Sequence, residues 1–287
     1  MRLGVVGMMP KSLDEITPQH LAAIRELNLT GVGMGLPGTE MGGVTQATVD
    51  RTRRLFADAE MDFAQLIVGF GGCLFDPDPA VRSDLVEQIS AGVRLSQRIG
   101  AHVTLIRTGS LNPSGSYNPS RENHAPECHE RLVDTLRRVA ETAEAFGQTV
   151  VIETHVLTIM NSPEVNAEIL SAVGSEHMKV VMDYVNHFQA LHQVYDSTAR
   201  INHIYDVMGP ISAIGHCKDI SVGNGFVTHF SEEIPGEGEL DMATALRRWH
   251  ESYPDGYMML EHLPEEQYPL ASRNTHRILA QAGIPVY

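Results

Sequence analysis

Four polar residues each close a short apolar run in the second half of the chain. The runs VVIE, VVMD, AIGH and MMLE end in Glu153, Asp183, His216 and Glu261. One polar residue where a strand leaves the core is ordinary, but four in the last four strand-like segments are not. Three carboxylates and one imidazole that converge at one end of a parallel barrel would bind a divalent cation. The sequence therefore predicts a metal enzyme.

These runs fit an alternation of strands and helices along the whole chain. The strand candidates are Leu3–Gly7, Gly31–Met34, Phe63–Gly69, His102–Gly109, Thr149–His155, Lys179–Asn186, Ile211–Ile220 and Tyr257–Leu263. Helical apolar spacing occurs between them, as in Thr17–Leu27, Ala47–Glu60, Ala80–Ile99, Glu127–Phe146, Val165–Val173, Met242–Trp249 and Gln267–Gln281. Such alternation indicates parallel strands with crossover helices, and eight strands can close. We expect an α/β protein with a single (β/α)8 TIM-barrel domain over residues 1–287.

Composition restricts the partners more than the fold. The net charge of −15 opposes attraction of a polyanion, so we expect no nucleic-acid partner and a small neutral substrate. Three widely spaced cysteines, Cys73, Cys128 and Cys217, indicate neither a disulfide framework nor a thiolate zinc site. No segment has the length and apolarity of a signal sequence or membrane span. A cytoplasmic enzyme with no membrane partner is the expectation.

Three long loops follow predicted strands and so belong at the mouth of the barrel. They are Leu36–Thr45, Thr108–Asn123 and Ser221–Leu240. The second contains flexible Gly and Ser, two prolines, and Tyr117, which could stack on a sugar face. We expect this loop to cover the substrate and Tyr117 to bind it. The alternative is a surface excursion or a subunit contact.

The ordered motifs of the C-terminal half resemble a known family. Glu153 in ETH, Asp183 in DYVNH, His216 in HCKD, the GEGELD loop and Glu261 in LEH are similar to the sugar isomerase/epimerase superfamily of xylose-isomerase-like barrels. The resemblance implies that these four residues bind one divalent ion, Mn²⁺ first, with Mg²⁺, Co²⁺ or Zn²⁺ as alternatives. It also implies that Glu153 and Glu261 move the substrate proton through a metal-stabilised enediolate. We therefore expect a sugar or sugar-derivative isomerase/epimerase that forms a homo-oligomer.

Other polar residues near the strand ends are candidates for catalysis or substrate binding. His155 lies in phase with Glu153 and could act as acid or base, or bind a sugar hydroxyl; otherwise it is a satisfied strand-end histidine. Lys218 bears the same relation to His216 and could instead pair with Asp219. Arg107 ends the fourth strand in phase with its apolar residues. His229, in the loop before PGEGELD, completes this set of substrate-binding candidates.

The chain departs from the D-tagatose 3-epimerase pattern at two places. Asn186 stands where that pattern has a histidine three residues after the metal aspartate, and His187, one place later, is kept as a substrate-binding candidate. Ile159 stands where a second substrate-binding glutamate is expected. These departures leave an alternative open: a lyase, dehydratase or deglycosidase acting on 3-keto sugars or glycosides. His155 would then be its base, and a deglycosidase could require a second subunit.

A nuclease and a non-catalytic barrel fit the sequence less well. Endonuclease IV-type relatives need histidines at the ends of strands three and four to bind three metals. Here the third strand ends in LIVGFGG, and His102 starts the fourth strand, at the wrong side of the barrel. A purely structural partner subunit would not need four intact ligands.

Overall fold

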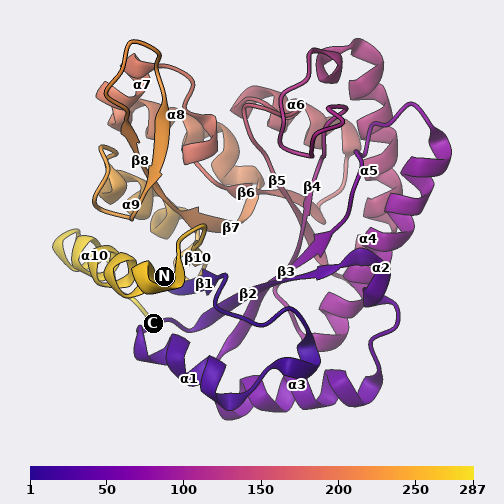
Figure 1. Ribbon diagram of the computed structural model, residues 1–287, viewed down its shortest axis with the longest axis horizontal. Helices are drawn as coiled ribbons and strands as arrows, with labels where there is room; N and C mark the ends of the chain where they lie inside the picture. Colours follow the sequence, from indigo (N-terminus) through magenta and orange to yellow (C-terminus); the bar gives the residue numbers. More distant parts are fainter.

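The computed structural model describes residues 1–287 as a closed barrel of eight parallel strands with helices around it (Figure 1). Around the barrel the order is β1-β10-β7-β6-β5-β4-β3-β2, and β1 pairs with β10 to close it. The barrel strands are β1 (Arg2–Val6), β2 (Gly31–Pro37), β3 (Asp62–Gly69), β4 (Val103–Arg107), β5 (Thr149–Glu153), β6 (Met178–Met182), β7 (Ser212–Cys217) and β10 (Tyr257–Leu260). The predicted (β/α)8 barrel is confirmed.

The helices follow the expected alternation and have recognisable ends. They are α1 (Pro18–Glu26), α2 (Gly38–Met41), α3 (Gln46–Asp58), α4 (Pro79–Ile99), α5 (Pro126–Phe146), α6 (Pro163–Val173), α7 (Leu191–Tyr195), α8 (Ser197–Met208), α9 (Met242–Ser252) and α10 (Tyr268–Gln281). Each of α4, α5 and α6 starts with proline and ends before a glycine in the left-handed region, namely Gly100, Gly147 and Gly174. None of the helices combines the length and apolarity needed to cross a bilayer.

Two features were not apparent from the sequence pattern. Helices α7 and α8 fill the connection between β6 and β7. The predicted strand Ile211–Ile220 divides at Lys218, because β7 ends at Cys217 and β8 (Asp219–Val222) begins a separate antiparallel hairpin with β9 (Phe230–Glu233). The apolar pattern continues through this break, so it gave no sign of the division. This hairpin projects from the barrel beyond the end of β7 (Figure 1).

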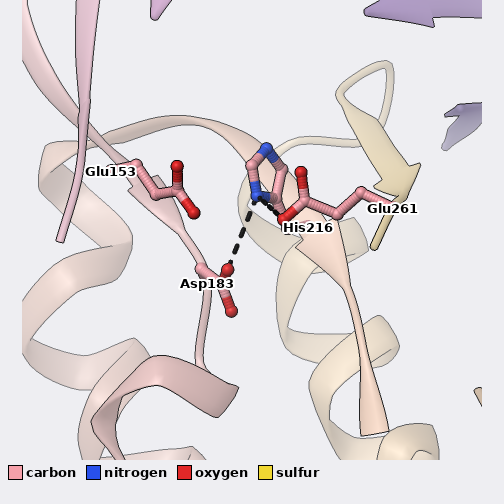
Figure 2. A group of neighbouring side chains, drawn as sticks. All are labelled: Glu153, Asp183, His216 and Glu261. Atoms are coloured by element: carbon pink, nitrogen blue, oxygen red, sulfur yellow. Dashed lines mark ion pairs between the residues drawn. The ribbon is translucent and has the colours of Figure 1, made fainter. Parts of the chain in front are cut away.

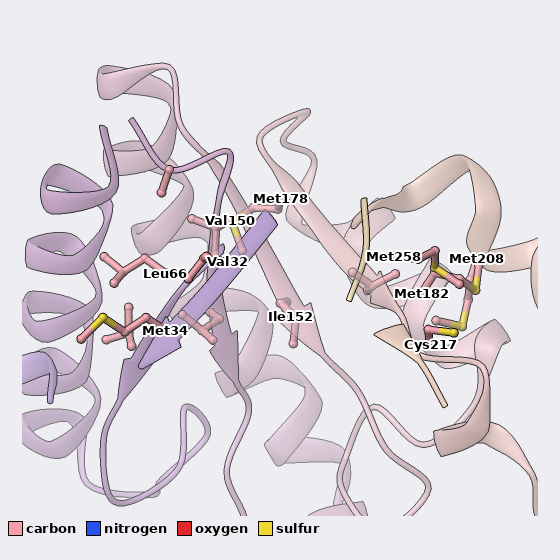
Figure 3. Packing of buried hydrophobic residues seen from close by; sticks show 14 of the residues in the cluster. Val32, Met34, Leu66, Val150, Ile152, Met178, Met182, Met208, Cys217 and Met258 are labelled. Carbon is pink, nitrogen blue, oxygen red and sulfur yellow. The ribbon is translucent and has the colours of Figure 1, made fainter. Parts of the chain in front are cut away.

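Strand alternation separates two apolar cores. The barrel interior holds a small cluster consisting of Ala64, Val103, Leu105, Val151, Val181, Ile214, Tyr257 and Met259. A larger cluster of 65 residues includes the opposite face of the strands, for example Val150 and Ile152 of β5 (Figure 3). Because side chains alternate along a strand, a residue two places after an interior residue also faces the interior. This phase decides which strand-end side chains meet at the mouth.

Candidate active site

Four side chains meet at the carboxyl end of the barrel (Figure 2). Glu153 ends β5, Asp183 follows β6, His216 lies in β7 and Glu261 follows β10. Each lies two residues after an interior apolar residue of its own strand; these are Val151, Val181, Ile214 and Met259. One ligand atom from each of the four lies within 4.8 Å of the others, and all four side chains are buried. The strand phase therefore brings the predicted ligands together.

The arrangement of these atoms fits a divalent cation. His216 Nδ1 lies 2.8 Å from Glu261 Oε1 and 3.5 Å from Asp183 Oδ2. Nevertheless Asp183 Oδ1, His216 Nδ1 and Glu261 Oε1 are buried without a properly oriented hydrogen bond. Buried polar atoms are nearly always hydrogen-bonded, so such atoms call for a further partner. Three carboxylates and one imidazole are donors suited to one hard or borderline cation.

Gln65 orients the imidazole and was not found from the sequence. Its Oε1 lies 3.2 Å from His216 Nε2, and both side chains are fully buried. An amide oxygen only accepts, so Nε2 carries the hydrogen and Nδ1 is directed to the carboxylates of Asp183 and Glu261. A second partner of this kind holds a metal-binding histidine in its binding orientation.

A β-bulge explains why Gln65 faces the interior. Simple alternation from Phe63, which packs in the outer cluster, would direct Gln65 outward. The pairing of β2 with β3 shifts between Val32 and Gly33, so that Ala64 has no partner and Gln65 pairs with Gly33. A Cβ atom at Gly33 would lie 2.9 Å from Gln65 Cγ, so the glycine leaves room for this side chain.

Lys218 neutralises the carboxylates from within the site. Its Nζ lies 2.8 Å from both Asp183 Oδ2 and Glu261 Oε1, and 3.4 Å from Glu232 Oε1. Burial opposes ionisation, but Lys218 and His216 hold the pKa of Asp183 down at about 2 and lower that of Glu261 well below its usual value. Although burial lowers it, these carboxylates raise the pKa of His216 to about 10. A metal ion would have to displace this proton and compete with the ammonium.

Asp219 has a different function from its neighbour. The expected alternative, a pair between Lys218 and Asp219, does not form. The Asp219 carboxylate instead accepts hydrogen bonds from the backbone N–H groups of Ile220, Gly236, Gly238 and Leu240. A Cβ atom at Gly238 would lie 2.4 Å from Asp219 Oδ1, so the loop can approach only with glycine there. The GEGELD motif thus fastens its loop to the base of the β8–β9 hairpin.

Arg107 and Tyr117 support Glu153 from the β4 side. Arg107 Nε donates to Glu153 Oε2 at 3.0 Å. The Arg107 guanidinium lies 4.6 Å from the centre of the Tyr117 ring, which meets the His155 ring edge-on at 6.0 Å. The Tyr117 hydroxyl is buried without a hydrogen-bond partner, while burial and the nearby Glu153 carboxylate raise its pKa. The loop Thr108–Asn123 therefore contributes a polar group to the site.

His155 presents a donor. The backbone N–H of Leu157 donates to His155 Nδ1 at 3.1 Å. The neutral ring consequently carries its hydrogen on Nε2. Burial lowers the pKa of His155, so the neutral form is favoured.

A cavity of about 380 Å³ opens beside these groups. It is lined by Tyr117, Glu153, His155, Val156, Val185, Asn186, Phe188, Lys218, Ile220, Phe230, Glu232 and His262. Glu232 and His262 are additions to the predicted set; each contacts Lys218, and His262 directly follows Glu261 in the LEH motif. No sequence signal singled out Glu232.

The structure does not bring His187 or His229 to the cavity. His187 is fully buried in the turn after β6, with Nε2 3.0 Å from Thr154 Oγ1. This 3-10 turn directs Asn186 instead to the metal-ligand group, where its Nδ2 donates to Asp183 Oδ2 at 2.9 Å. His229 is exposed in the turn between β8 and β9.

The family to which the sequence matches has the barrel fold described above. The sequence matches the family described as xylose isomerase-like TIM barrel over residues 21–280, and the chain belongs to that family. None of the curated proteins matches it by sequence.

Solved structures share the fold at low identity. A D-tagatose 3-epimerase-like protein superposes with a TM-score of 0.74 at 17% identity, covering 99% of this chain and 98% of that one. A xylose isomerase-like barrel from Mycobacterium smegmatis, solved with magnesium, gives 0.73 at 13% identity, covering 98% and 96%. The 3-keto-D-glucoside 4-epimerase of E. coli gives 0.71 at 12% identity, covering 98% and 99%.

Proposed function

We propose that this protein is a divalent-metal-dependent isomerase or epimerase of sugars or sugar derivatives, with Mn²⁺ as the first candidate metal. The observation that carries the proposal is the buried group of three carboxylates and one imidazole beside a cavity. Several proteins with the same fold are named as sugar epimerases, and these names support a sugar as the substrate class.

In this proposal the two glutamates move the substrate proton. Around the barrel β6 and β7 lie between β5 and β10, so Glu153 and Glu261 approach the group from its two sides. Arg107 holds one glutamate and Lys218 the other. When bound, a divalent ion would polarise a substrate carbonyl and acidify the adjacent C–H. One glutamate can then take the proton. Its return to the opposite face gives an epimer, and its return to the neighbouring carbon gives an aldose–ketose isomer.

A lyase acting on 3-keto sugars or glycosides is the second candidate, favoured by one observation. His155 lines the cavity with Nε2 as a donor, which could protonate a departing hydroxyl or glycosidic oxygen. This differs from the expected use of His155 as the base, because the Leu157 N–H already occupies Nδ1.

Metal analysis tests the site. After dialysis against Mn²⁺, the wild type should retain one ion per chain, and the Glu153→Gln/Asp183→Asn variant none. The control is Glu26→Gln/Asp58→Asn, which removes the same charge from exposed carboxylates and should retain the ion. Full retention by the Glu153/Asp183 variant would refute the site.

Incubation in D₂O with ketoses and 3-keto glycosides, followed by NMR, tests the reaction. An isomerase or epimerase should yield a rearranged sugar with deuterium beside the carbonyl. Release of water or an aglycone identifies the lyase instead. If the metal-loaded protein changes none of these compounds, both candidates fail.

A further inference from the structure

The β8–β9 hairpin presents one face to the cavity, and that face changes character along its length. In its register, Ile220 lies opposite Glu232 and Val222 opposite Phe230. Opposed residues, and residues two apart on a strand, share a face. These four side chains therefore lie on one face, while Ser221 Oγ bonds Glu233 on the other.

Glu232 marks the end of this face that lies at the metal ligands. Its Oε1 lies 3.4 Å from Lys218 Nζ and 3.2 Å from His262 Nδ1. Phe230, which also lines the cavity, precedes Glu232 by two residues at the start of β9, about 6–7 Å away toward the tip of the hairpin. The hairpin thus leads from a charged inner end to an apolar outer part.

Further apolar lining residues come from the segments that follow β5 and β6. Val185 and Phe188 line the cavity from the segment after β6, and Val156 from the segment after β5. A backbone hydrogen bond from Val156 N to Asn186 O, 3.1 Å long, ties these two segments together. These two segments are therefore braced against each other, and they contribute Val156, Val185 and Phe188 to the lining together with the polar His155 and Asn186.

Charged lining groups stay at the inner end. Glu153 is itself a candidate ligand, Lys218 contacts two ligands, and Glu232 and His262 contact Lys218. Sugar hydroxyls placed against Phe230, Ile220 and Val185 would lose hydration without gaining partners from these side chains, whereas an apolar group would gain from the same burial.

We propose that the substrate is a sugar with an apolar substituent, an alkyl or aryl glycoside. Its reacting carbons lie at Glu153 and Glu261, and its aglycone lies between Phe230 and Ile220 on one side and Val185 on the other. This inference rests on the proposed function and specifies its substrate class. The cavity, about 380 Å³, is at the small end of the range for drug-sized ligands and suits a compact substituent.

Calorimetric binding to the Mn²⁺-loaded protein tests this with methyl and phenyl 3-keto-β-D-glucosides. The phenyl compound should bind about tenfold or more tightly than the methyl compound. Phe230→Ala should reduce that preference by about fivefold and leave methyl binding within about twofold. Val185→Thr, which keeps the side-chain shape on the facing wall, should act in the same direction. Phe226→Ala, a fully exposed phenylalanine of the same hairpin, is the matched control and should change neither affinity.

Equal affinity for the two glycosides overturns the inference, as does a phenyl preference that survives both cavity variants. Failure of the phenyl compound to bind also overturns it. The proposed function is judged separately by deuterium exchange into free ketoses. Deuterium exchange into a ketose, together with equal affinities for the methyl and phenyl glycosides, would support the proposed function and refute the apolar substituent.

Discussion

Replacement of Gln65 with leucine should weaken divalent metal binding by about 10- to 100-fold without removing any ligand. Gln65 Oε1 is the partner of His216 Nε2, and the pair is fully buried. In the variant this N–H is left without an acceptor, which costs about 1–3 kcal/mol. The ring is then free to leave its binding orientation. Since about 1.4 kcal/mol corresponds to a factor of ten in affinity, a cost of about 1–3 kcal/mol agrees with the expected loss of about 10- to 100-fold.

The assay is competition for Mn²⁺ with a chelating dye, with folding checked by thermal denaturation. Gln148→Leu is the control, because Gln148 is also buried but precedes β5 at the far end of the barrel, where its Nε2 donates to Ala101 O at 3.1 Å. Both variants should lose some stability, and only Gln65→Leu should lose affinity. Wild-type affinity in Gln65→Leu, or equal loss in both variants, would refute the orienting role.

Three further predictions follow from buried groups. Lys218→Met should lower the melting temperature of the metal-free protein, because Asp183 and Glu261 lose their nearest ammonium. Added Mn²⁺ should then raise the melting temperature of this variant by more than it raises that of the wild type. An equal or smaller rise contradicts this. Burial lowers the pKa of His187 to about 4, so stability should be full above pH 6.5 and fall toward pH 4, by up to about 3 kcal/mol in urea unfolding. His187→Gln should flatten that part of the profile, and an unchanged slope would exclude His187 as its source. Tyr117→Phe should leave the melting temperature unchanged, since the hydroxyl has no protein partner. It should lower kcat/KM about tenfold, because the substrate loses a hydrogen bond from this hydroxyl. Unchanged kinetics would count against a contact between Tyr117 and the substrate.

The convergence of the four candidate ligands could be predicted because their positions depend on short-range rules. Glu153 and Asp183 follow buried apolar runs, and the parallel arrangement places the carboxyl ends of all strands at one mouth. Two-residue periodicity then fixes the side of each strand that a terminal residue faces. The same rule predicted Arg107 at the mouth as a substrate contact, and there its Nε donates to Glu153.

What the sequence could not reveal depends on irregular backbone or on long-range packing. Gln65 reaches the interior only through the shift at Ala64, which alternation does not anticipate. His187 and Asn186 are neighbours in a 3-10 turn, and the turn decides which one meets Asp183. Glu232 reaches Lys218 because the segment after Lys218 folds back as a hairpin, a pairing set by contacts outside its own sequence.

The four backbone hydrogen bonds accepted by Asp219 have a consequence for how this barrel can diversify. The carboxylate fastens the base of the β8–β9 hairpin and the loop around Gly238, so the position of Lys218 does not depend on the turn at residues 223–229. Insertions, deletions or exchanges in that turn can therefore accumulate without displacing Lys218 from Asp183 and Glu261. The turn is therefore a place where selection or design can add a new surface segment while Ile220 and Phe230 keep their places in the cavity lining.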